Sequence, residues 1–325
     1  MSVDVCRTWL VTGGCGFIGK NLVNLLLRSA QSVVVYDNFS VGNARDLISY
    51  LGDLGSSSNL KIIEGDVCDP TGVAIASKGV DVFVHLAGNT GVAPSVEDPM
   101  FDCQSNVVGT LNCLEAAKQE DVERFVFASS GAPAGEVTPP ISENVVPRPV
   151  SPYGASKLAG EGYCSAFYRT FGLETVVLRF GNVYGPGSTH KSSVVAKFIR
   201  RALQGDVLEV YGDGSQTRDF IFVHDLLDAI VKASHAQSVG GEIFQVATSA
   251  ETSVSELLDL VAPLFQEFGV DYQVAYSKPR LGDVSRNFSD TRKAKKLLGW
   301  QASTVLTDGL RATFLDLEKR FRGSV

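Results

Sequence analysis

The chain has 325 residues, 44% of them hydrophobic and 20% charged, and carries a formal net charge of −7 at pH 7. This composition is ordinary for a soluble globular enzyme, and the length suits one large domain or two modest ones. The negative charge disfavours nucleic acid and anionic membrane surfaces as partners.

The cysteines and the apolar runs indicate the cellular compartment of the protein. The six cysteines form no Cys-x-x-Cys pair and no cluster with histidine, so we expect reduced thiols and no metal site. No secretory signal precedes the first predicted strand, and no apolar run approaches the roughly 20 residues that span a bilayer. These patterns predict a cytoplasmic protein without membrane contact.

The first predicted strand, Trp9 to Val11, leads into a glycine-rich segment and then into a stretch whose apolar residues recur at helical spacing. In that segment Gly14, Gly16 and Gly19 match the Gly-x-Gly-x-x-Gly dinucleotide fingerprint, and Gly13 adds the form Gly-x-x-Gly-x-x-Gly. Such glycines let a backbone approach a pyrophosphate at the start of a helix. By itself the motif also fits a tight strand-to-helix turn without a ligand.

A second apolar run, Val33 to Tyr36, ends in Asp37. An acid about 20 residues beyond the glycine turn, at the end of the second strand, is placed to hold the adenosine ribose 2′-hydroxyl. Its charge would repel the 2′-phosphate of NADP. The sequence therefore favours NAD, although Arg45 lies close enough in the chain to leave NADP open.

Further strand-like runs alternate with helical stretches along the chain. They are Leu60 to Glu64, Val80 to Leu86, Arg124 to Ser129 and Thr175 to Phe180. This alternation predicts a parallel sheet covered on both faces, which is a doubly wound α/β domain. In such sheets ligands bind beyond the carboxyl ends of the strands.

The ends of the third and fourth strands carry residues suited to a flat cofactor. Asp66 follows the third strand, where it would accept a hydrogen bond from the adenine amino group or serve as a turn aspartate. Leu86 to Gly88 follow the fourth and would let the cofactor pass close to the backbone, whereas His85 is expected to be structural. Asn106, in the next helix, would brace the adjacent strand backbone or face solvent.

The fifth strand ends in Ser129 and Ser130, which places two hydroxyls at the ligand-binding edge of the sheet. After a proline-rich loop Ser151 reads as a helix cap, so Tyr153 and Lys157 lie one turn apart on one helix face. Tyr-x-x-x-Lys alone is common on solvated helices. Together with a dinucleotide turn and a strand-end serine pair, it is far more specific.

These residues suit the oxidation of an alcohol. A tyrosine keeps its proton at neutral pH, with a pKa near 10, unless something stabilises the phenolate. Lys157 and the positive charge of an oxidised nicotinamide would both do so. Tyr153 would then remove a hydroxyl proton while a hydride passes to NAD, with Ser130 holding the same oxygen. The reaction gives a ketone and is reversible.

The chain resembles the extended short-chain dehydrogenase/reductases of the NAD-dependent epimerase/dehydratase family that act on nucleotide sugars, and within them the 4-epimerases. The resemblance covers almost the entire chain. It rests on ordered motifs at residues Thr12–Gly19, His85–Gly88, Ser129–Ser130, Tyr153–Lys157, Arg179–Pro186, Gly212–Phe220 and Arg280–Asp283. It implies a Rossmann domain over residues 1–180, a smaller substrate lobe over 181–325 from which some strands and helices return to the first domain, and a homodimer.

The same resemblance implies roles for individual residues. The residues expected to bind NAD are Gly13, Gly16, Phe17, Ile18, Gly19, Asp37, Asn38, Asp66, Val67, Leu86, Ala87, Gly88, Asn106, Tyr153 and Lys157. Asn182 would contact the diphosphate-sugar and Asp283 the nucleotide ribose. Arg218 and Arg280 would clamp the phosphates of a UDP-sugar, since two guanidinium groups match a pyrophosphate well.

The residues after Ser130 bear on which reaction follows the oxidation. The 4,6-dehydratases of this family place Asp-Glu there, the decarboxylases a glutamate, and the 3,5-epimerase/reductases a cysteine. Here the positions hold Gly131 and Ala132, neither of which can move a proton. The sequence therefore predicts 4-epimerisation, which needs only Tyr153, Ser130 and a retained cofactor.

Two alternatives stay open. One is an NAD(P)H-dependent reductase of a 4-keto nucleotide sugar, which would exchange its cofactor at each turnover. The other is a non-catalytic protein that senses the cofactor, although such proteins typically lose the tyrosine and lysine that this chain keeps.

Three positions bear on the sugar. The family usually has a hydroxyl residue at Ala132 and ends that segment in Val-Tyr-Gly, so the stretch from Gly131 to Gly135 lacks a hydrogen bond to the sugar and an aromatic packing residue. Uronic acid 4-epimerases tend to have threonine at Asn182, which favours a neutral hexose here. Epimerases confined to glucose and galactose often carry tyrosine at Asn287, so the smaller side chain would leave room for an N-acetyl group.

Overall fold

The structure is a computed structural model that describes residues 6–189, 193–278 and 284–322. Within them lies a seven-stranded sheet with the order β11-β6-β5-β4-β1-β2-β3, in which all neighbours are parallel. Its strands are β1 (Thr8–Thr12), β2 (Ser32–Asp37), β3 (Leu60–Glu64), β4 (Val82–His85), β5 (Arg124–Ser130), β6 (Thr175–Phe180) and β11 (Glu242–Val246). The strand order reverses between β1 and β4, where doubly wound sheets bind ligands. The predicted doubly wound α/β fold is confirmed.

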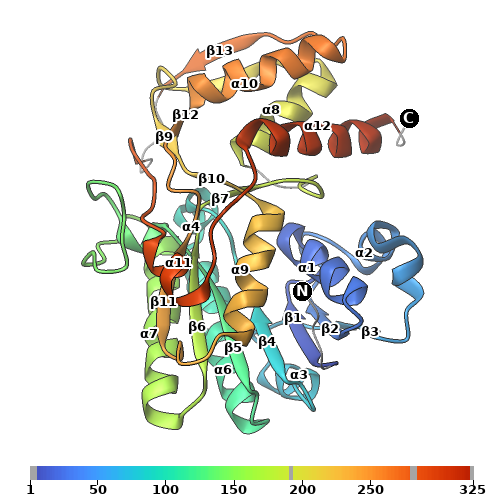
Figure 1. The fold of residues 1–325 in the computed structure, drawn as a ribbon, viewed down its shortest axis with the longest axis vertical. Coiled ribbons are helices and arrows are strands. Elements are labelled where there is room, and N and C mark those ends of the chain that lie inside the picture. Colours follow the sequence, from blue (N-terminus) through green and yellow to red (C-terminus); the bar gives the residue numbers. More distant parts are fainter. Residues whose placement is uncertain (1–5, 190–192, 279–283, 323–325) are drawn as a thin grey trace.

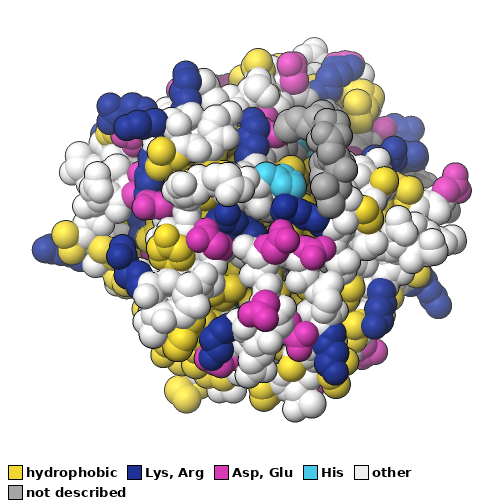
Figure 2. All heavy atoms as spheres, turned by 60° about the horizontal axis from the view of Figure 1, so that its bottom comes forward, with side chains coloured by type: hydrophobic (Ala, Val, Ile, Leu, Met, Phe, Trp, Pro, Cys, Tyr) yellow, Lys and Arg dark blue, Asp and Glu magenta, His cyan; other side chains and the backbone are white. Residues whose placement is uncertain are grey.

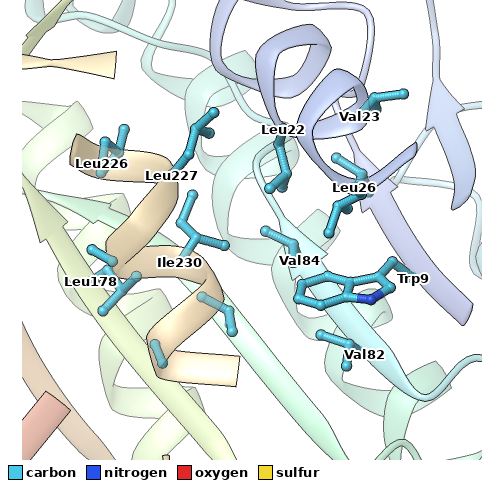
Figure 3. Packing of buried hydrophobic residues seen from close by; sticks show 14 of the residues in the cluster. Trp9, Leu22, Val23, Leu26, Val82, Val84, Leu178, Leu226, Leu227 and Ile230 are labelled. Carbon is cyan, nitrogen blue, oxygen red and sulfur yellow. The ribbon is translucent and has the colours of Figure 1, made fainter. Parts of the chain in front are cut away.

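Helices cover both faces of this sheet (Figure 1). On one face α1 (Phe17–Arg28) and α9 (Val223–His235) lie over the strands. Figure 3 shows side chains of both helices packed with residues of β1, β4 and β6; these are Leu22, Leu26, Leu226, Leu227, Ile230, Trp9, Val82, Val84 and Leu178. Because parallel strands are buried on both faces, they read as continuous apolar runs, which made them visible in the sequence.

The opposite face is covered by α3 (Pro70–Ala76), α6 (Gly109–Gln119) and α7 (Pro152–Phe171). Its core is rich in phenylalanine and includes Phe83, Phe125, Phe127 and Phe167. Shorter elements join the strands: α2 (Ala44–Leu51), α4 (Val92–Glu97), α5 (Pro99–Cys103), a π-helical turn (Gln104–Val108) and 3-10 helices at Gly52–Ser56 and Ala132–Ala134.

A second lobe lies beyond one end of the sheet (Figure 1). Its helices are α8 (Val194–Gln204), α10 (Val254–Glu267) and α12 (Leu306–Arg322). Its short strand pairs are β7 (Asn182–Tyr184) with β10 (Phe220–Phe222), β8 (Leu208–Tyr211) with β13 (Val274–Ser277), and β9 (Thr217–Arg218) with β12 (Thr252–Ser253). The lobe has a core of its own, in which Phe198, Leu257 and Phe314 are almost fully buried.

The chain crosses between the two parts more than once. After β10 it returns through α9 to β11, which pairs with β6, and α11 (Arg292–Leu298) then lies beside β11. A division at residue 180 with later elements returning to the first domain stays a prediction.

The expected element ends differ from the structure in a few places. The strand expected from Val80 begins at Val82 and ends at His85, and the strand expected over Trp9 to Val11 extends from Thr8 to Thr12. A capping box begins α10: Ser253 N donates to Glu256 Oε2 at 2.7 Å and Glu256 N to Ser253 Oγ at 3.1 Å.

Among the described residues, no helix combines the length and apolar character required to cross a bilayer. Figure 2 shows one face of the molecule, on which basic and acidic side chains are intermixed.

Candidate active site

The glycine turn joins β1 to α1, and its shape depends on missing side chains. Gly13 has φ +68°, and a Cβ there would lie 2.9 Å from the backbone nitrogen of Ala87. A Cβ on Gly19 would lie 2.2 Å from the carbonyl oxygen of Gly13. Gly16 is the N-cap of α1 and makes no side-chain cap, so the N–H groups of the first turn are open to an anion.

Asp37 lies at the end of β2 and is tied to this turn. Its Oδ2 accepts from the backbone N–H of Cys15 at 2.9 Å, and its Oδ1 accepts from that of Phe39 at 2.8 Å. Burial raises the pKa of Asp37, whereas these two hydrogen bonds oppose the shift. The carboxylate expected to hold the ribose therefore also braces the turn expected to hold the pyrophosphate.

Asn38 and Asp66 meet at the ends of β2 and β3. The Asn38 side-chain amide donates to Asp66 Oδ2 at 2.9 Å, and the N–H of Cys68 donates to Asp66 Oδ1 at 2.8 Å. Partial burial favours the neutral acid, but these bonds prevail and lower the pKa of Asp66. Val67 is buried beside Gly109.

His85 is structural, as expected. It is fully buried, with Nδ1 2.8 Å from the Thr12 hydroxyl and Nε2 3.1 Å from the Thr110 hydroxyl. Thr110 donates its proton to the carbonyl of Asn106, so Nε2 of the histidine must be its donor, and Nδ1 accepts from Thr12. Burial, with a smaller effect from Lys157, lowers the pKa of His85 to about 3. The neutral ring thus fixes the loop that follows β4.

Asn106 lies in the π-helical turn and is 1% exposed, so it does not face solvent. Its amide donates to the carbonyl of Asn89 at 3.0 Å, which braces the chain after β4. A Cβ on Gly88 would lie 2.6 Å from Asn106 Oδ1 and 3.5 Å from Lys157 Nζ. The structure thus brings Gly88, Asn106 and Lys157 together.

The helix α7 presents the tyrosine and the lysine. Ser151 caps it by accepting from the N–H of Gly154 at 3.1 Å, and Pro152 is its first residue. Burial raises the pKa of Tyr153, and a hydrogen bond with Ser130 opposes this shift. Ser130 and Tyr153, which are far apart in the chain, are therefore in contact at the edge of the sheet.

Lys157 is 4% exposed, and its Nζ donates to the carbonyl of Ala128 at 3.0 Å. The ammonium also lies 5.0 Å from the centre of the Phe127 ring. Burial lowers the pKa of Lys157 to about 8, while nearby anionic groups, of which Asp102 acts most strongly, raise it. The lysine therefore stays mostly charged at neutral pH.

The two strand-end serines point to different partners. Ser129 donates to Glu161 Oε1 at 2.6 Å, and Glu161 also forms a buried ion pair with Arg179 at 2.7 Å. Ser130 instead accepts from the N–H of Ala132 at 3.2 Å. Sequence reasoning missed this network under α7, although Glu161 follows Lys157 by one helical turn.

The residues expected to bind the substrate come from three segments in and beside the second lobe. The backbone N–H of Asn182 donates to the carbonyl of Asp219 at 2.8 Å, and Arg218 Nη1 donates to the carbonyls of Thr217 and Val284 at 2.7 and 2.9 Å. A Cβ on Gly131 would lie 3.7 Å from the Asn287 side chain, so this residue is next to the Ser130 loop. Arg280 and Asp283 lie outside the described residues.

Asp219 is a second residue that sequence reasoning missed. It is 1% exposed and accepts from the N–H and hydroxyl of Thr248 and from the N–H groups of Ser249 and Ser289. Burial raises its pKa, although these bonds oppose the shift. It joins the Arg218 strand to the segment that carries Asn287. In the sequence, only its position directly after Arg218 could have pointed to Asp219 as part of this region.

The match to known proteins spans nearly the whole chain. Residues 9–247 match the model of the NAD dependent epimerase/dehydratase family. The chain is 38% identical over 310 residues to the UDP-glucose 4-epimerase of Mycolicibacterium smegmatis, which covers 94% of this chain and 96% of the relative. The UDP-glucose 4-epimerase of Thermotoga maritima, solved with UDP-glucose, has a TM-score of 0.88 and 34% identity, covering 96% of this chain and 99% of that one. The Thermus thermophilus UDP-glucose 4-epimerase, solved with NAD, has a TM-score of 0.85 and 35% identity, covering 98% and 100%.

Proposed function

This chain belongs to the NAD-dependent epimerase/dehydratase family, and we propose that it is an NAD-dependent 4-epimerase of a UDP-hexose, acting on UDP-glucose and UDP-galactose and accepting their N-acetylated forms. The observation that carries the proposal is the contact of Ser130 with Tyr153 one turn from Lys157, in a site where Gly131 and Ala132 offer no further acid or base.

The glycine turn fits the cofactor. The contacts that a Cβ would make at Gly13 and Gly19 show a backbone packed too closely for side chains, and α1 begins with an uncapped turn that can face a pyrophosphate. Asp37 would hold the adenosine ribose, and Asn38 and Asp66 would border the adenine. Bound NAD supplies the acceptor for the C4 hydride and returns it in the second half of the reaction.

Tyr153 carries the proton in this mechanism. As a phenolate it takes the proton of the sugar C4 hydroxyl when the C4–H bond breaks, and it returns that proton when the alcohol is restored. Ser130 donates a hydrogen bond to the same oxygen. Lys157 lowers the cost of the phenolate because its ammonium is one helical turn away in a site screened from water.

Inversion requires the ketone to present its opposite face to the hydride that bound NAD would return, while its oxygen stays within reach of Tyr153. The sugar must therefore turn while the rest of the substrate stays bound. In this proposal Arg218 and Arg280 hold the diphosphate, Asp283 holds the nucleotide ribose, and Asn182 contacts the diphosphate-sugar. Asn287 beside Gly131 leaves space at the sugar for an acetamido group.

We also propose a cytoplasmic homodimer. All six cysteines are free, which suits a reducing compartment. For the dimer, apolar side chains are exposed on α4 and α5, which pack against α7: Val96 is 60% exposed, Met100 79% and Phe101 56%. Helices with such a surface pair readily with a second copy.

The reaction can be tested by incubating the protein with UDP-glucose, UDP-galactose and their N-acetylated counterparts without added cofactor and following the sugar by NMR. We expect the C4 epimer to appear from at least one of them. If no C4 inversion occurs even when NAD is supplied, the proposal is wrong. Consumption of NADH in proportion to a 4-keto sugar would instead identify the reductase.

A further inference from the structure

Behind the tyrosine and lysine lies a buried carboxylate that the mechanism above leaves without a role. Asp102, on α5, is 1% exposed. Its Oδ1 accepts from the side-chain amides of Asn106 at 3.0 Å and Asn89 at 3.3 Å. Its Oδ2 is buried and has no hydrogen-bond partner among the residues that the structure describes. Keeping an incompletely paired carboxylate out of water is costly, so its place beside reacting groups indicates a function.

Asp102 is connected to Tyr153 through two side chains. Asn106 Nδ2, which contacts Asp102, also lies 3.1 Å from Ser156 Oγ, and Ser156 donates to the backbone carbonyl of Tyr153 at 3.0 Å. The acceptors around Nδ2 fix the orientation of the Asn106 amide, because a flipped amide would point its oxygen at the Asp102 carboxylate. Asp102 thereby links α5 to the first turn of α7.

Asp102 also acts on the reacting pair through space. Its charge raises the pKa of Tyr153 and raises that of Lys157, against the burial that lowers the lysine to about 8. The other groups around Lys157 are Tyr153, Glu161 and Cys164 on α7, His85 on β4, and Arg179 on β6.

These other groups are mostly neutral or paired with an opposite charge. His85 is neutral because burial lowers its pKa to about 3, and Cys164 is a thiol because burial raises its pKa. Glu161 is neutralised by Arg179 at 2.7 Å. Asp102, by contrast, makes no ion pair within the described part of the chain, so its charge acts on Lys157 without compensation.

We propose that Asp102 is a positioning residue for the tyrosine and lysine: through Asn106 and Ser156 it fixes the start of α7, and its buried carboxylate places a negative charge near them. A kcat measurement tests this role only if the protein is the proposed 4-epimerase. A titration of Tyr153 needs no turnover, so the role of Asp102 and the proposed function can fail separately.

Asp102→Asn removes the charge and keeps an oxygen that Asn106 and Asn89 can contact. The rate should rise with pH as Tyr153 loses its proton and fall as Lys157 loses its own. Since the Asp102 charge raises both pKa values, its removal should move both limbs of the kcat profile to lower pH and lower kcat on the alkaline side by roughly tenfold. The KM for the UDP-sugar should stay unchanged.

Two controls separate charge from packing. Glu115→Gln removes a negative charge from a partly buried pair with Lys118 on α6 and should leave the profile unchanged. Ser156→Ala breaks the link to Tyr153 without changing charge, so it should lower kcat at every pH and leave the limbs in place.

The Tyr153 titration can be followed without turnover by the ultraviolet absorbance of tyrosinate in the NAD-loaded protein, with Tyr153→Phe subtracted. We expect Tyr153 to titrate at lower pH in Asp102→Asn, and in Asp102→Ser should the first variant not fold. An unmoved Tyr153 titration in the folded neutral variant, or a kcat loss that is uniform across pH, would overturn the inference. If the parent protein does not epimerise the sugars, the proposed function is wrong, and the Tyr153 titration still decides whether Asp102 has the proposed role.

Discussion

The side chains proposed to react are held by contacts with backbone groups. Lys157 donates to the Ala128 carbonyl, Ser130 accepts from the N–H of Ala132, and Ser156 donates to the backbone carbonyl of Tyr153. These contacts hold Lys157, Ser130 and the backbone of Tyr153 in place before any ligand arrives. Such placement is what proton transfer over a hydrogen-bond distance requires.

Removal of one oxygen atom tests the role of the tyrosine. Tyr153→Phe keeps the ring and its packing but cannot carry a proton, so we expect kcat to fall by about 10²- to 10⁴-fold. The NAD released on denaturation should match that of the parent, because the glycine turn is untouched. Undiminished turnover in a variant that still carries NAD would refute the assigned role.

The volume next to Gly131 sets the expected sugar range. Asn287→Tyr should fill the space beside that glycine and lower kcat/KM for the N-acetylated sugars by about tenfold or more relative to UDP-glucose. Asn287→Ala, which enlarges the same space, is the matched control and should keep both activities. Equal turnover of acetylated and plain sugars by the tyrosine variant would show that this position does not limit the pocket.

The glycine turn, with β1 before it and α1 after it, is the element on which the proposed cofactor binding depends. Gly19→Ala would place a methyl group 2.2 Å from the carbonyl oxygen of Gly13. We expect it to reduce the free energy of unfolding by about 1–3 kcal/mol and to lose bound NAD. Gly162→Ala, in an exposed part of α7 with nothing within 4 Å, should instead stabilise the protein by about 0.5–1 kcal/mol. Chemical denaturation and cofactor content measure both effects, and a Gly19→Ala protein with normal NAD content would contradict this account of the turn.

Local patterns made these elements predictable. The glycine turn, the apolar strands and the capped start of α7 depend on residues within a few positions of one another, and the sequence displays them directly. The networks around Asp102, Glu161 and Asp219 do not: each joins polar groups from segments far apart in the chain. Their partners become visible only once the sheet order is known. The pairing of β11 with β6 escaped prediction for the same reason.

In the molecule as a whole, the proposed site lies where the sheet and the second lobe meet. Ser130 and Tyr153 come from the sheet and α7, whereas Asn182, Arg218 and Asn287 come from the segments around the second lobe. A further contact joins the lobes: Asn21 on α1 donates to the Pro186 carbonyl at 3.0 Å, and the N–H of the next residue, Gly187, donates to Asp316 on α12 at 2.7 Å.

The proposed dimer can be tested on the exposed apolar side chains of α4 and α5. Met100→Asp combined with Phe101→Asp should halve the mass measured by light scattering, because charged groups cannot be buried against a second copy without pairing. Ile75→Asp on α3, where the side chain is 57% exposed, is the matched control and should leave the mass unchanged. A parent protein that is already monomeric would contradict the proposal.

The central claim is that one retained NAD removes the hydrogen at C4 of the sugar and gives the same hydrogen back. The most direct test is to supply UDP-glucose carrying deuterium at C4, with no added cofactor, and to follow the product by NMR. We predict that UDP-galactose forms with the deuterium still at C4. Formation of the inverted sugar with solvent hydrogen at C4 would contradict the claim.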